Sequence, residues 1–388
     1  MSIQQNTDRI QTTHVGSLPR PHNLLDLMKE KYSGRPYDQG AYRGVLRDAV
    51  VESVRKQVEC GIDIVSDGEF SKPGFFTYVQ ERLEGFEARP GQQLKTFAKE
   101  VDAFPEYYAE YFKTAMMGGA ILPLAPVVCI GPVKYHGQKL IQIDIENVKA
   151  AARASGVPDH RVFLPATAPS GVGSNEYYRT EEDYFHAVAA AMRQEYLAIV
   201  DAGLLVQIDD PFLSDIFVDP DLDAAQMRRR AGIYIEAVNA ALAGISAEKV
   251  RFHTCYGINE GPRIFEAGLA DVIQHVLRIN AGSFSFEAAN PRHEHEYHLF
   301  ERITVPKDKV LCPGVITHAS NIVEHPEWIA ERLVRFAQLV GRENVIAGAD
   351  CGFSSQALYR TEVHPTVVWE KFKAMRQGAD LATKRLWN

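Results

Sequence analysis

The sequence predicts an α/β fold, and within that class a (β/α)₈ barrel with its active site at the carboxyl ends of the strands. Amphipathic helical segments alternate with short apolar segments, which is the pattern of βαβ units in a parallel sheet. Glycines such as Gly61 and Gly203 stand between a helix and its strand, where a helix commonly ends. Polar residues follow the apolar segments, and barrels build their active sites at those positions.

Five helix–strand units carry this pattern. In each, an apolar periodicity of about 3.6 residues gives way to a short apolar run, which indicates a helix followed by a buried strand. The units are 42–60 with 62–65, 181–201 with 204–208, 223–243 with 250–255, 262–280 with 283–287, and 327–341 with 345–351.

Four further segments read as strands: 12–17, 126–130, 161–166 and 310–316. The total of nine exceeds the eight of a barrel. No good crossover helix precedes the second of them, so we assign 126–136 to an inserted hairpin. We expect the polar and aromatic stretch 85–118 to be an excursion that caps the barrel. No linker composition interrupts the chain, which favours one domain over residues 1–388.

Composition excludes several classes of function. The formal net charge is −8, and the longest basic run is Arg228–Arg230, so we expect no nucleic-acid partner. No apolar stretch is long enough to span a membrane, and residues 1–9 are polar, so we expect neither a membrane protein nor a secretory signal. Five scattered cysteines do not suggest a disulfide framework, which favours reduced thiols in the cytoplasm.

The residues at the strand ends are the candidate site. If the barrel forms, its strand ends converge on one face and bring these side chains together. They are Ser17, Glu69, Asp209, His253, Cys255, Glu287, His318 and Cys351.

Some of these residues suit a metal ion. His253 and Cys255 are two residues apart, so on a strand they point the same way. Together with Cys351 and Glu287 they form a donor set that suits tetrahedral Zn²⁺. An isolated pair of this kind more often only packs in a core, and the shared position at strand ends is what favours metal binding. We expect the remaining cysteines, Cys60, Cys129 and Cys312, to be packing residues. We expect the run 292–298 (RHEHEYH) to be a solvated face, from which one side chain could line the mouth of the site.

Several segments resemble the catalytic barrel of the cobalamin-independent methionine synthases, and the similarity covers nearly the whole chain. The segments that carry it are 12–20 (TTHVGSLPR), 67–69 (DGE), 207–211 (QIDDP), 253–256 (HTCY), 313–319 (PGVITHA) and 350–352 (DCG).

The resemblance implies a role for each site residue. His253, Cys255, Glu287 and Cys351 would bind Zn²⁺. Ser17, Glu69 and Asp209 would bind the amino and carboxylate ends of homocysteine, and His318 would handle protons near the transferred methyl group. Zinc coordination keeps a thiol ionised at neutral pH, so the expected reaction is methyl transfer to a thiol.

The resemblance is incomplete where the family binds folate. The full-length enzymes have a second, N-terminal barrel, which we do not expect in this protein, and segment 166–177 lacks the tryptophan expected to stack on folate. Asp210 replaces a glutamate. We therefore expect methyltetrahydrofolate to be a poor donor, and a methylated corrinoid protein or a small electrophile to be a better one.

Two other functions remain open from the sequence. The epoxyalkane:coenzyme M transferases resemble the same barrel and use zinc to activate a different thiol. A barrel of the uroporphyrinogen-decarboxylase type would keep only the fold, and it would not need His253, Cys255 and Cys351 together.

Overall fold

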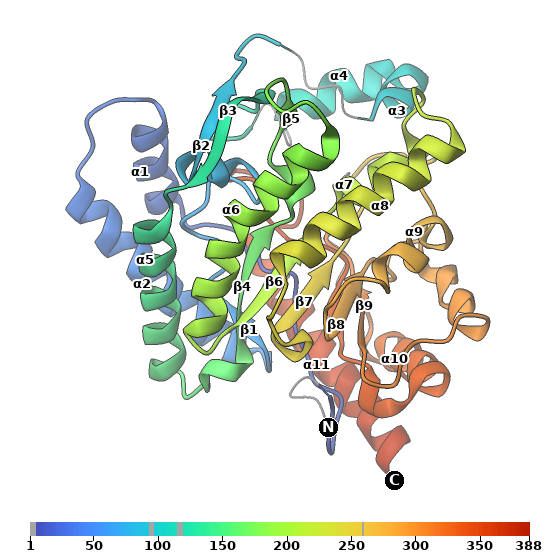
Figure 1. The fold of residues 1–388 in the computed structure, drawn as a ribbon. Coiled ribbons are helices and arrows are strands. Elements are labelled where there is room, and N and C mark those ends of the chain that lie inside the picture. Colours follow the sequence, from blue (N-terminus) through green and yellow to red (C-terminus); the bar gives the residue numbers. More distant parts are fainter. Residues whose placement is uncertain (1–4, 93–96, 115–118, 258–259) are drawn as a thin grey trace.

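The computed structural model describes residues 5–92, 97–114, 119–257 and 260–388. At its centre is a curled sheet of seven strands, and all neighbouring pairs are parallel. Helices cover its outer face (Figure 1). The strands, in spatial and chain order, are β1 (Val65–Ser66), β4 (Val162–Thr167), β6 (Leu205–Asp209), β7 (Val250–His253), β8 (Ser283–Phe286), β9 (Val310–Ile316) and β10 (Gly348–Ala349).

The helices begin at residues that can cap them. Thr180 accepts a hydrogen bond from Asp183 N at the start of α6, and Asp223 forms a capping box with Gln226 at the start of α8. Among the described helices, none has both the length and the apolarity to cross a membrane. The α-helices are α1 (His22–Tyr32), α2 (Gln39–Glu59), α3 (Ala98–Ala103), α4 (Pro105–Thr114), α5 (Gln138–Ala154), α6 (Glu181–Asp201), α7 (Phe212–Asp215), α8 (Ala224–Ala241), α9 (Leu269–Val276), α10 (Pro326–Val340) and α11 (Pro365–Trp387).

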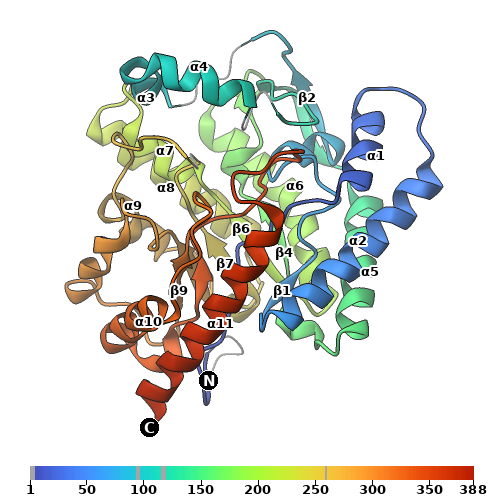
Figure 2. The same cartoon turned by 180° about the vertical axis from the view of Figure 1, so that it is seen from behind.

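The predicted first strand, 12–17, is present only as two isolated parallel bridges. Thr12 bridges Ala347 next to β10, and Thr13 bridges Ile64 next to β1, so this segment connects the two edges of the sheet. Beyond Thr13 the chain leaves the ladder, and Ser17 comes to lie beside Gly352 at the strand ends. Figure 2 shows α11 in front of the sheet on this side of the molecule, and the Thr383 hydroxyl of α11 accepts from Ile10 N.

Two other predictions differ from the structure. The helix predicted over 262–280 is only the eight-residue α9, because the preceding segment places the buried Arg263 against the site. The inserted strand β3 (Val127–Tyr135) is not half of a local hairpin. It pairs antiparallel with the distant β2 (Leu83–Ala88) and parallel with β5 (Ser174–Asn175), forming a separate three-stranded sheet.

The predicted excursion over 85–118 starts within β2, and its described helices are α3 and α4. They lie at the end of the molecule opposite the two termini (Figure 1). The Glu100 carboxylate accepts a hydrogen bond from Phe265 N at 2.8 Å, and Tyr107 contacts the carbonyl of Glu260. The excursion therefore packs against the segment between β7 and α9.

The interior of the curled sheet is layered. One layer is a small apolar cluster that includes Ile64, Phe163 and Val310. In the next layer, the guanidinium of Arg251 lies 3.9 Å from the centre of the Phe163 ring. Its three nitrogens donate to Gln207 Oε1, Thr13 Oγ1 and the carbonyl of His14, at 3.1, 2.8 and 2.9 Å. Arg251 thus links the middle of the sheet to the segment that joins its edges.

We predict that Arg251→Met lowers the free energy of unfolding by at least about 3 kcal/mol, because three buried acceptors lose their donor. Chemical denaturation followed by circular dichroism measures this. Arg229→Ala is the control, since Arg229 forms an exposed ion pair with Glu182 and should leave the denaturation midpoint unchanged. An unchanged midpoint for Arg251→Met would contradict the linking role.

Candidate metal centre and active site

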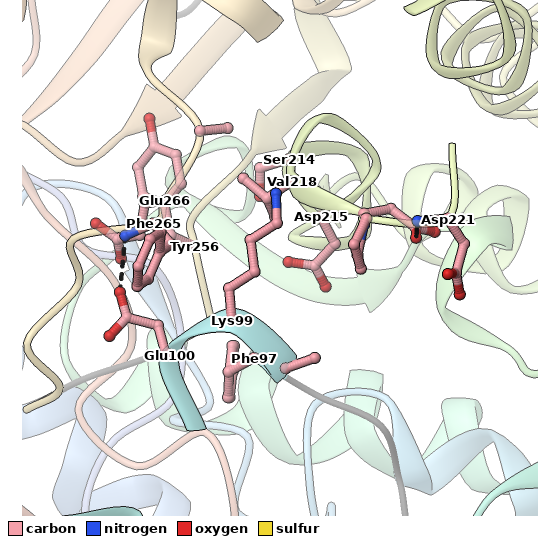
Figure 3. Close-up of a pocket in the computed structure, with 14 residues that line it drawn as sticks. Phe97, Lys99, Glu100, Ser214, Asp215, Val218, Asp221, Tyr256, Phe265 and Glu266 are labelled. Atoms are coloured by element: carbon pink, nitrogen blue, oxygen red, sulfur yellow. Dashed lines mark hydrogen bonds between the residues drawn. The ribbon is translucent and has the colours of Figure 1, made fainter. Parts of the chain in front are cut away.

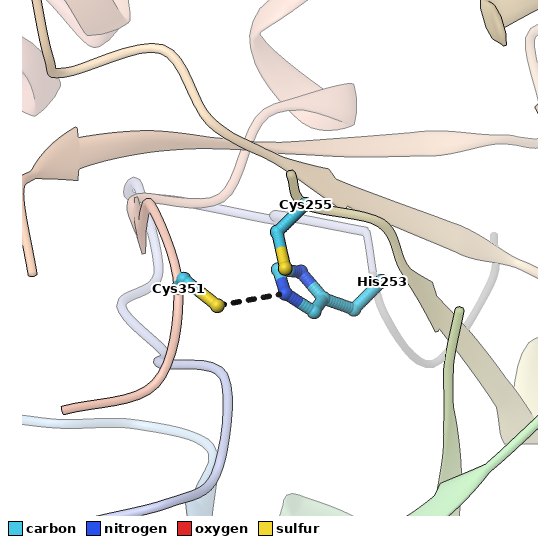
Figure 4. Close-up of side chains that lie close together, drawn as sticks. All are labelled: His253, Cys255 and Cys351. Atoms are coloured by element: carbon cyan, nitrogen blue, oxygen red, sulfur yellow. Dashed lines mark hydrogen bonds between the residues drawn. The ribbon is translucent and has the colours of Figure 1, made fainter. Parts of the chain in front are cut away.

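Three predicted metal ligands come together at the strand ends. His253 is the last residue of β7, Cys255 lies two residues on, and Cys351 follows β10. Their donor atoms all lie within 4.8 Å of one another, and all three side chains are buried (Figure 4). The Cys351 Sγ lies 3.6 Å from His253 Nε2. We call these residues the ligand cluster.

The orientation of His253 is set by its neighbour on β8. His253 Nδ1 lies 3.2 Å from the hydroxyl of Ser285, which leaves Nε2 facing Cys351. Burial and the charge of Arg251 lower the pKa of His253 to about 3, so the ring is neutral at pH 7. A neutral imidazole with its second nitrogen held by a hydrogen bond is the form that binds metals.

The geometry and electrostatics of the ligand cluster fit a zinc ion. Zinc–ligand bonds of about 2.0–2.3 Å place tetrahedral donors roughly 3.3–3.8 Å apart. The 3.6 Å separation of the sulfur of Cys351 and the nitrogen of His253 falls in this range. A hydrogen bond with Cys255, burial and the nearby charge of Glu287 raise the pKa of Cys351 well above its usual value. The two thiols therefore need a cation to ionise together.

Glu287, the fourth predicted ligand, lies beside the ligand cluster. It belongs to a second buried group, with His318 and Asp350, whose donor atoms also lie within 4.8 Å of one another. Its Oε2 accepts hydrogen bonds from Arg263 and Asn290, both at 2.7 Å. Its Oε1 is buried without a hydrogen-bond partner among the described residues. A buried carboxylate oxygen without a partner, close enough to the ligand cluster to raise the pKa of Cys351, is an atom that a metal ion would satisfy.

Asp350 holds the two halves of this region together. Its carboxylate accepts from the backbone N–H groups of Ala288, Ala289 and Asn290 at 2.7–3.0 Å, and from the amide of Asn290 at 3.0 Å. A Cβ on Gly314 would lie 2.0 Å from Asp350 Oδ1, so this approach needs glycine. With its oxygens already used, Asp350 fixes the loop that carries Glu287 against the loop that carries Cys351.

The predicted substrate-binding residues line one small cavity with the ligand cluster. Its volume is about 180 Å³, and Ser17, Glu69 and Asp209 open into it together with His253, Cys255 and Cys351. A Cβ on Gly352 would lie 2.0 Å from Ser17 Oγ, so glycine after Cys351 is what admits the serine. Aromatic rings form much of the remaining wall: Phe75, Phe76, Phe212 and Phe353.

Glu69 and Asp209 form a buried acidic pair in this cavity. Glu69 has a left-handed backbone (φ 59°), which is uncommon outside glycine, and Asp67 Oδ1 accepts from its N–H at 2.9 Å. Burial and the charge of Glu69 raise the pKa of Asp209 well above its usual value. Gln207 donates to Asp209 Oδ1 at 2.9 Å. Lys72 Nζ lies 3.5 Å from Glu69 Oε2 and offsets part of the charge of the pair, so a further positive group would be received mainly by Asp209.

His318 follows β9 and is buried next to Glu287. It is not among the residues that line the 180 Å³ cavity. Burial lowers the pKa of His318 well below 6.5, and the charge of Arg263 lowers it further. The ring is neutral at pH 7.

A second cavity of about 320 Å³ adjoins the first and shares Phe97 and Asp215 with it. Tyr256, Glu266 and Lys99 lie on its wall (Figure 3). The run 292–298 reaches this region, so the prediction of a solvated face is wrong for the buried residues His293 and Glu296. His293 is buried, and its ring stacks on Tyr256 with the ring centres 4.1 Å apart.

A family profile described as "Cobalamin-independent synthase, Catalytic domain" matches residues 10–135 and 138–377. The chain belongs to the cobalamin-independent methionine synthase family. The resemblance seen in the sequence motifs is thereby confirmed.

Individual members of the family are distant in sequence. A methionine synthase from Sulfolobus acidocaldarius is 25% identical over 345 residues, which are 88% of this chain and 85% of that protein. A methionine synthase from Saccharolobus islandicus is 23% identical and covers 97% and 95% of the two chains. The solved B12-independent methionine synthase from Shewanella sp. W3-18-1, in complex with selenomethionine, has the same fold. It matches with a TM-score of 0.73 and 20% identity over 97% of this chain and 99% of that chain.

Several residues that contact the candidate site residues were not predicted from the sequence. Ser285 and Arg263 orient His253 and Glu287 but carry no motif of their own. Asp350 could have been found, because it stands directly before Cys351 at a strand end. Neither Tyr177 nor Tyr178, the aromatic residues near the expected folate segment, lines the cavity.

We predict that Ser285→Ala weakens Zn²⁺ binding about 10- to 100-fold, as loss of a metal ligand's hydrogen-bond partner commonly does. Chelator competition measures the affinity. Ser283→Ala is the matched control, because Ser283 lies on the same strand without a hydrogen bond to His253 among the described residues. Cys351→Ser should abolish tight binding. Equal Zn²⁺ affinities for Ser285→Ala and Ser283→Ala would contradict the role of Ser285.

Proposed function

We propose that this protein transfers a methyl group to the sulfur of homocysteine to give methionine, with one zinc ion bound by His253, Cys255, Cys351 and Glu287. The observation that carries the proposal is that a metal-suited ligand cluster and a buried acidic pair open into one small cavity. Membership of the family and the methionine synthases among its relatives support the same reaction.

The cavity suits an amino-acid thiol. The acidic pair, Glu69 and Asp209, would bind the ammonium group, and the Ser17 hydroxyl would donate to the carboxylate. A bound zinc ion would supply a Lewis acid that keeps the substrate thiol ionised at neutral pH. Coenzyme M carries a sulfonate and no ammonium, so the acidic pair disfavours it. A decarboxylase would have no use for the ligand cluster.

The chain's own residues would organise the remaining chemistry. Phe75, Phe76 and Phe212 exclude water from the space above the ligand cluster, which strengthens the electrostatic interactions inside. We assign proton handling to His318. Its neutral imidazole can accept a proton, or donate a hydrogen bond to the leaving group.

The size of the cavity bears on the methyl donor. Pockets for larger ligands commonly measure about 300–1,000 Å³, and this one measures about 180 Å³. By itself this cavity has room for homocysteine and a methyl group, and a pterin would have to extend into the adjoining cavity of about 320 Å³. We therefore propose a small electrophile or a methylated corrinoid protein as donor, acting in the cytoplasm.

We also propose that the curled sheet is a (β/α)₈ barrel and that the chain is one domain. The bridges of Thr12 and Thr13 to both edges support a shortened first strand. A single large apolar cluster includes residues from Ile10 to Ala382 and supports one domain.

Homocysteine should release more protons on binding than 4-mercaptobutyrate, which lacks the amino group. Burial and the charge of Glu69 raise the pKa of Asp209, and a bound ammonium would lower it again, so ammonium binding favours loss of the proton. Calorimetry of the zinc-loaded protein in buffers of different ionisation enthalpy counts the protons. In Asp209→Asn the difference should vanish. Equal proton counts for both thiols in the unmodified protein would count against ammonium binding by the acidic pair.

We expect methionine to form from homocysteine with a methylated corrinoid as donor, and methyltetrahydrofolate to give at most a trace. Mass spectrometry with a deuterated methyl group measures the product. Heat-denatured protein and Cys351→Ser are the controls, since free corrinoids can methylate thiols slowly. Rapid turnover with methyltetrahydrofolate would overturn the assignment of the donor, whereas undiminished turnover by the zinc-free protein, or no turnover by the zinc-loaded protein with either donor, would overturn the proposed function.

A further inference from the structure

A row of five buried side chains with alternating charge leads away from the ligand cluster. Glu287 pairs with Arg263, Arg263 with Glu266, Glu266 with His293, and His293 with Glu296. Each side chain is less than a tenth exposed. We call this row the charge ladder. The proposed function uses only its first member.

Arg263 is the branched member of the charge ladder. Its Nη2 donates to Glu287 Oε2 at 2.7 Å, while its Nε donates to Glu266. Its backbone has φ 60°, a left-handed conformation that costs energy for any residue except glycine. Surrounding contacts must hold it there, and strain of this kind is commonly found at functional sites.

The far end of the charge ladder is anchored to the fold. Glu266 Oε2 lies 3.1 Å from His293 Nε2, and Glu296 lies 2.8 Å from His293 Nδ1. The other oxygen of Glu296 accepts from Leu269 N at 2.6 Å, at the start of α9. Tyr256, which follows Cys255 in the chain, stacks on the His293 ring. The anchor therefore holds Arg263 in a fixed position relative to the ligand cluster.

The two oxygens of the Glu287 carboxylate have different surroundings. Arg263 and Asn290 occupy Oε2, and Oε1 is left without a hydrogen-bond partner among the described residues. We propose that Arg263 is a positioning residue, which presents Oε1 of Glu287 as a single ligand atom to the metal site and is itself held by Glu266 and His293. The inference rests on the proposed function, because it requires that the cluster bind a metal ion.

A purely structural ion pair makes a different prediction. It would change stability without changing the affinity for the metal. Arg82 provides the comparison within this chain, because it is equally buried and pairs with Asp144 at 2.6 Å and Glu195 at 2.9 Å. None of these three residues belongs to the ligand cluster or lines its cavity.

The experiment measures Zn²⁺ affinity by chelator competition, and ligand type by X-ray absorption, for Arg263→Gln, Arg263→Lys, Glu287→Gln and Arg82→Lys. We expect Arg263→Gln to bind zinc about 10- to 100-fold more weakly. Arg263→Lys should bind with intermediate affinity, because lysine keeps the charge but lacks the fork that spans Glu266 and Glu287. Arg82→Lys should bind like the unmodified protein, and both sulfur ligands should persist in all four variants.

The double variant Arg263→Gln/Glu287→Gln decides whether Arg263 acts through Glu287. We expect it to bind zinc no more weakly than Glu287→Gln alone. Fully additive losses, or unchanged affinity in Arg263→Gln, would overturn the inference while leaving the proposed zinc site intact. If Arg263→Gln does not fold, as judged by circular dichroism, the lysine variant against Arg82→Lys gives the same test. Absence of zinc binding by the unmodified protein would overturn both the inference and the proposed function.

Discussion

The site depends on one carboxylate that accepts four hydrogen bonds. Asp350 joins the loop after β8 to the loop after β10, and these two loops carry Glu287 and Cys351. Parallel strands bring their ends to the same edge, but they do not fix the loops beyond that edge. The hydrogen bonds of Asp350 fix these two loops relative to each other. This position of Asp350 requires glycine at residue 314, because any side chain there would occupy the space of the carboxylate.

Burial determines how the other polar groups behave. Away from water, His253 is neutral at pH 7, and the pKa values of the Cys351 thiol and the Asp209 carboxyl are raised. Adding a charge to any of these buried groups costs free energy, and a nearby charge of opposite sign lowers that cost. A dication suits the two thiols, and an ammonium suits the acidic pair. The cavity is therefore suited to bind two positively charged groups, a metal ion and an ammonium, in neighbouring positions.

Local patterns in the sequence were enough to predict the order of helices and strands and most of the cluster. The helix over 181–201 and the strand over 310–316 have the predicted bounds, since their periodicity and glycine signals are local. Long-range pairing was not predictable. The partner of β3 is β2, some forty residues away, and nothing near 126–136 encodes that choice. The charge ladder was missed for the same reason, because a run of charged residues reads as solvated until its buried partners are known. The first strand was overestimated because the backbone leaves the sheet after Thr13, and nothing in segment 12–17 signals that turn.

The joint formed by Thr12 and Ala347 has a consequence for the order of events during folding. It pairs residues near the two ends of the chain, and such contacts form slowly because they must close a very long loop. Ser17 and Cys351 reach the cavity from either side of this joint, whereas His253 and Cys255 lie on one central strand and the residues after it. During synthesis on the ribosome, His253 and Cys255 emerge long before Cys351. The complete site therefore exists only after the last strand has been added, and until then the nascent protein offers a metal ion no more than part of its final coordination.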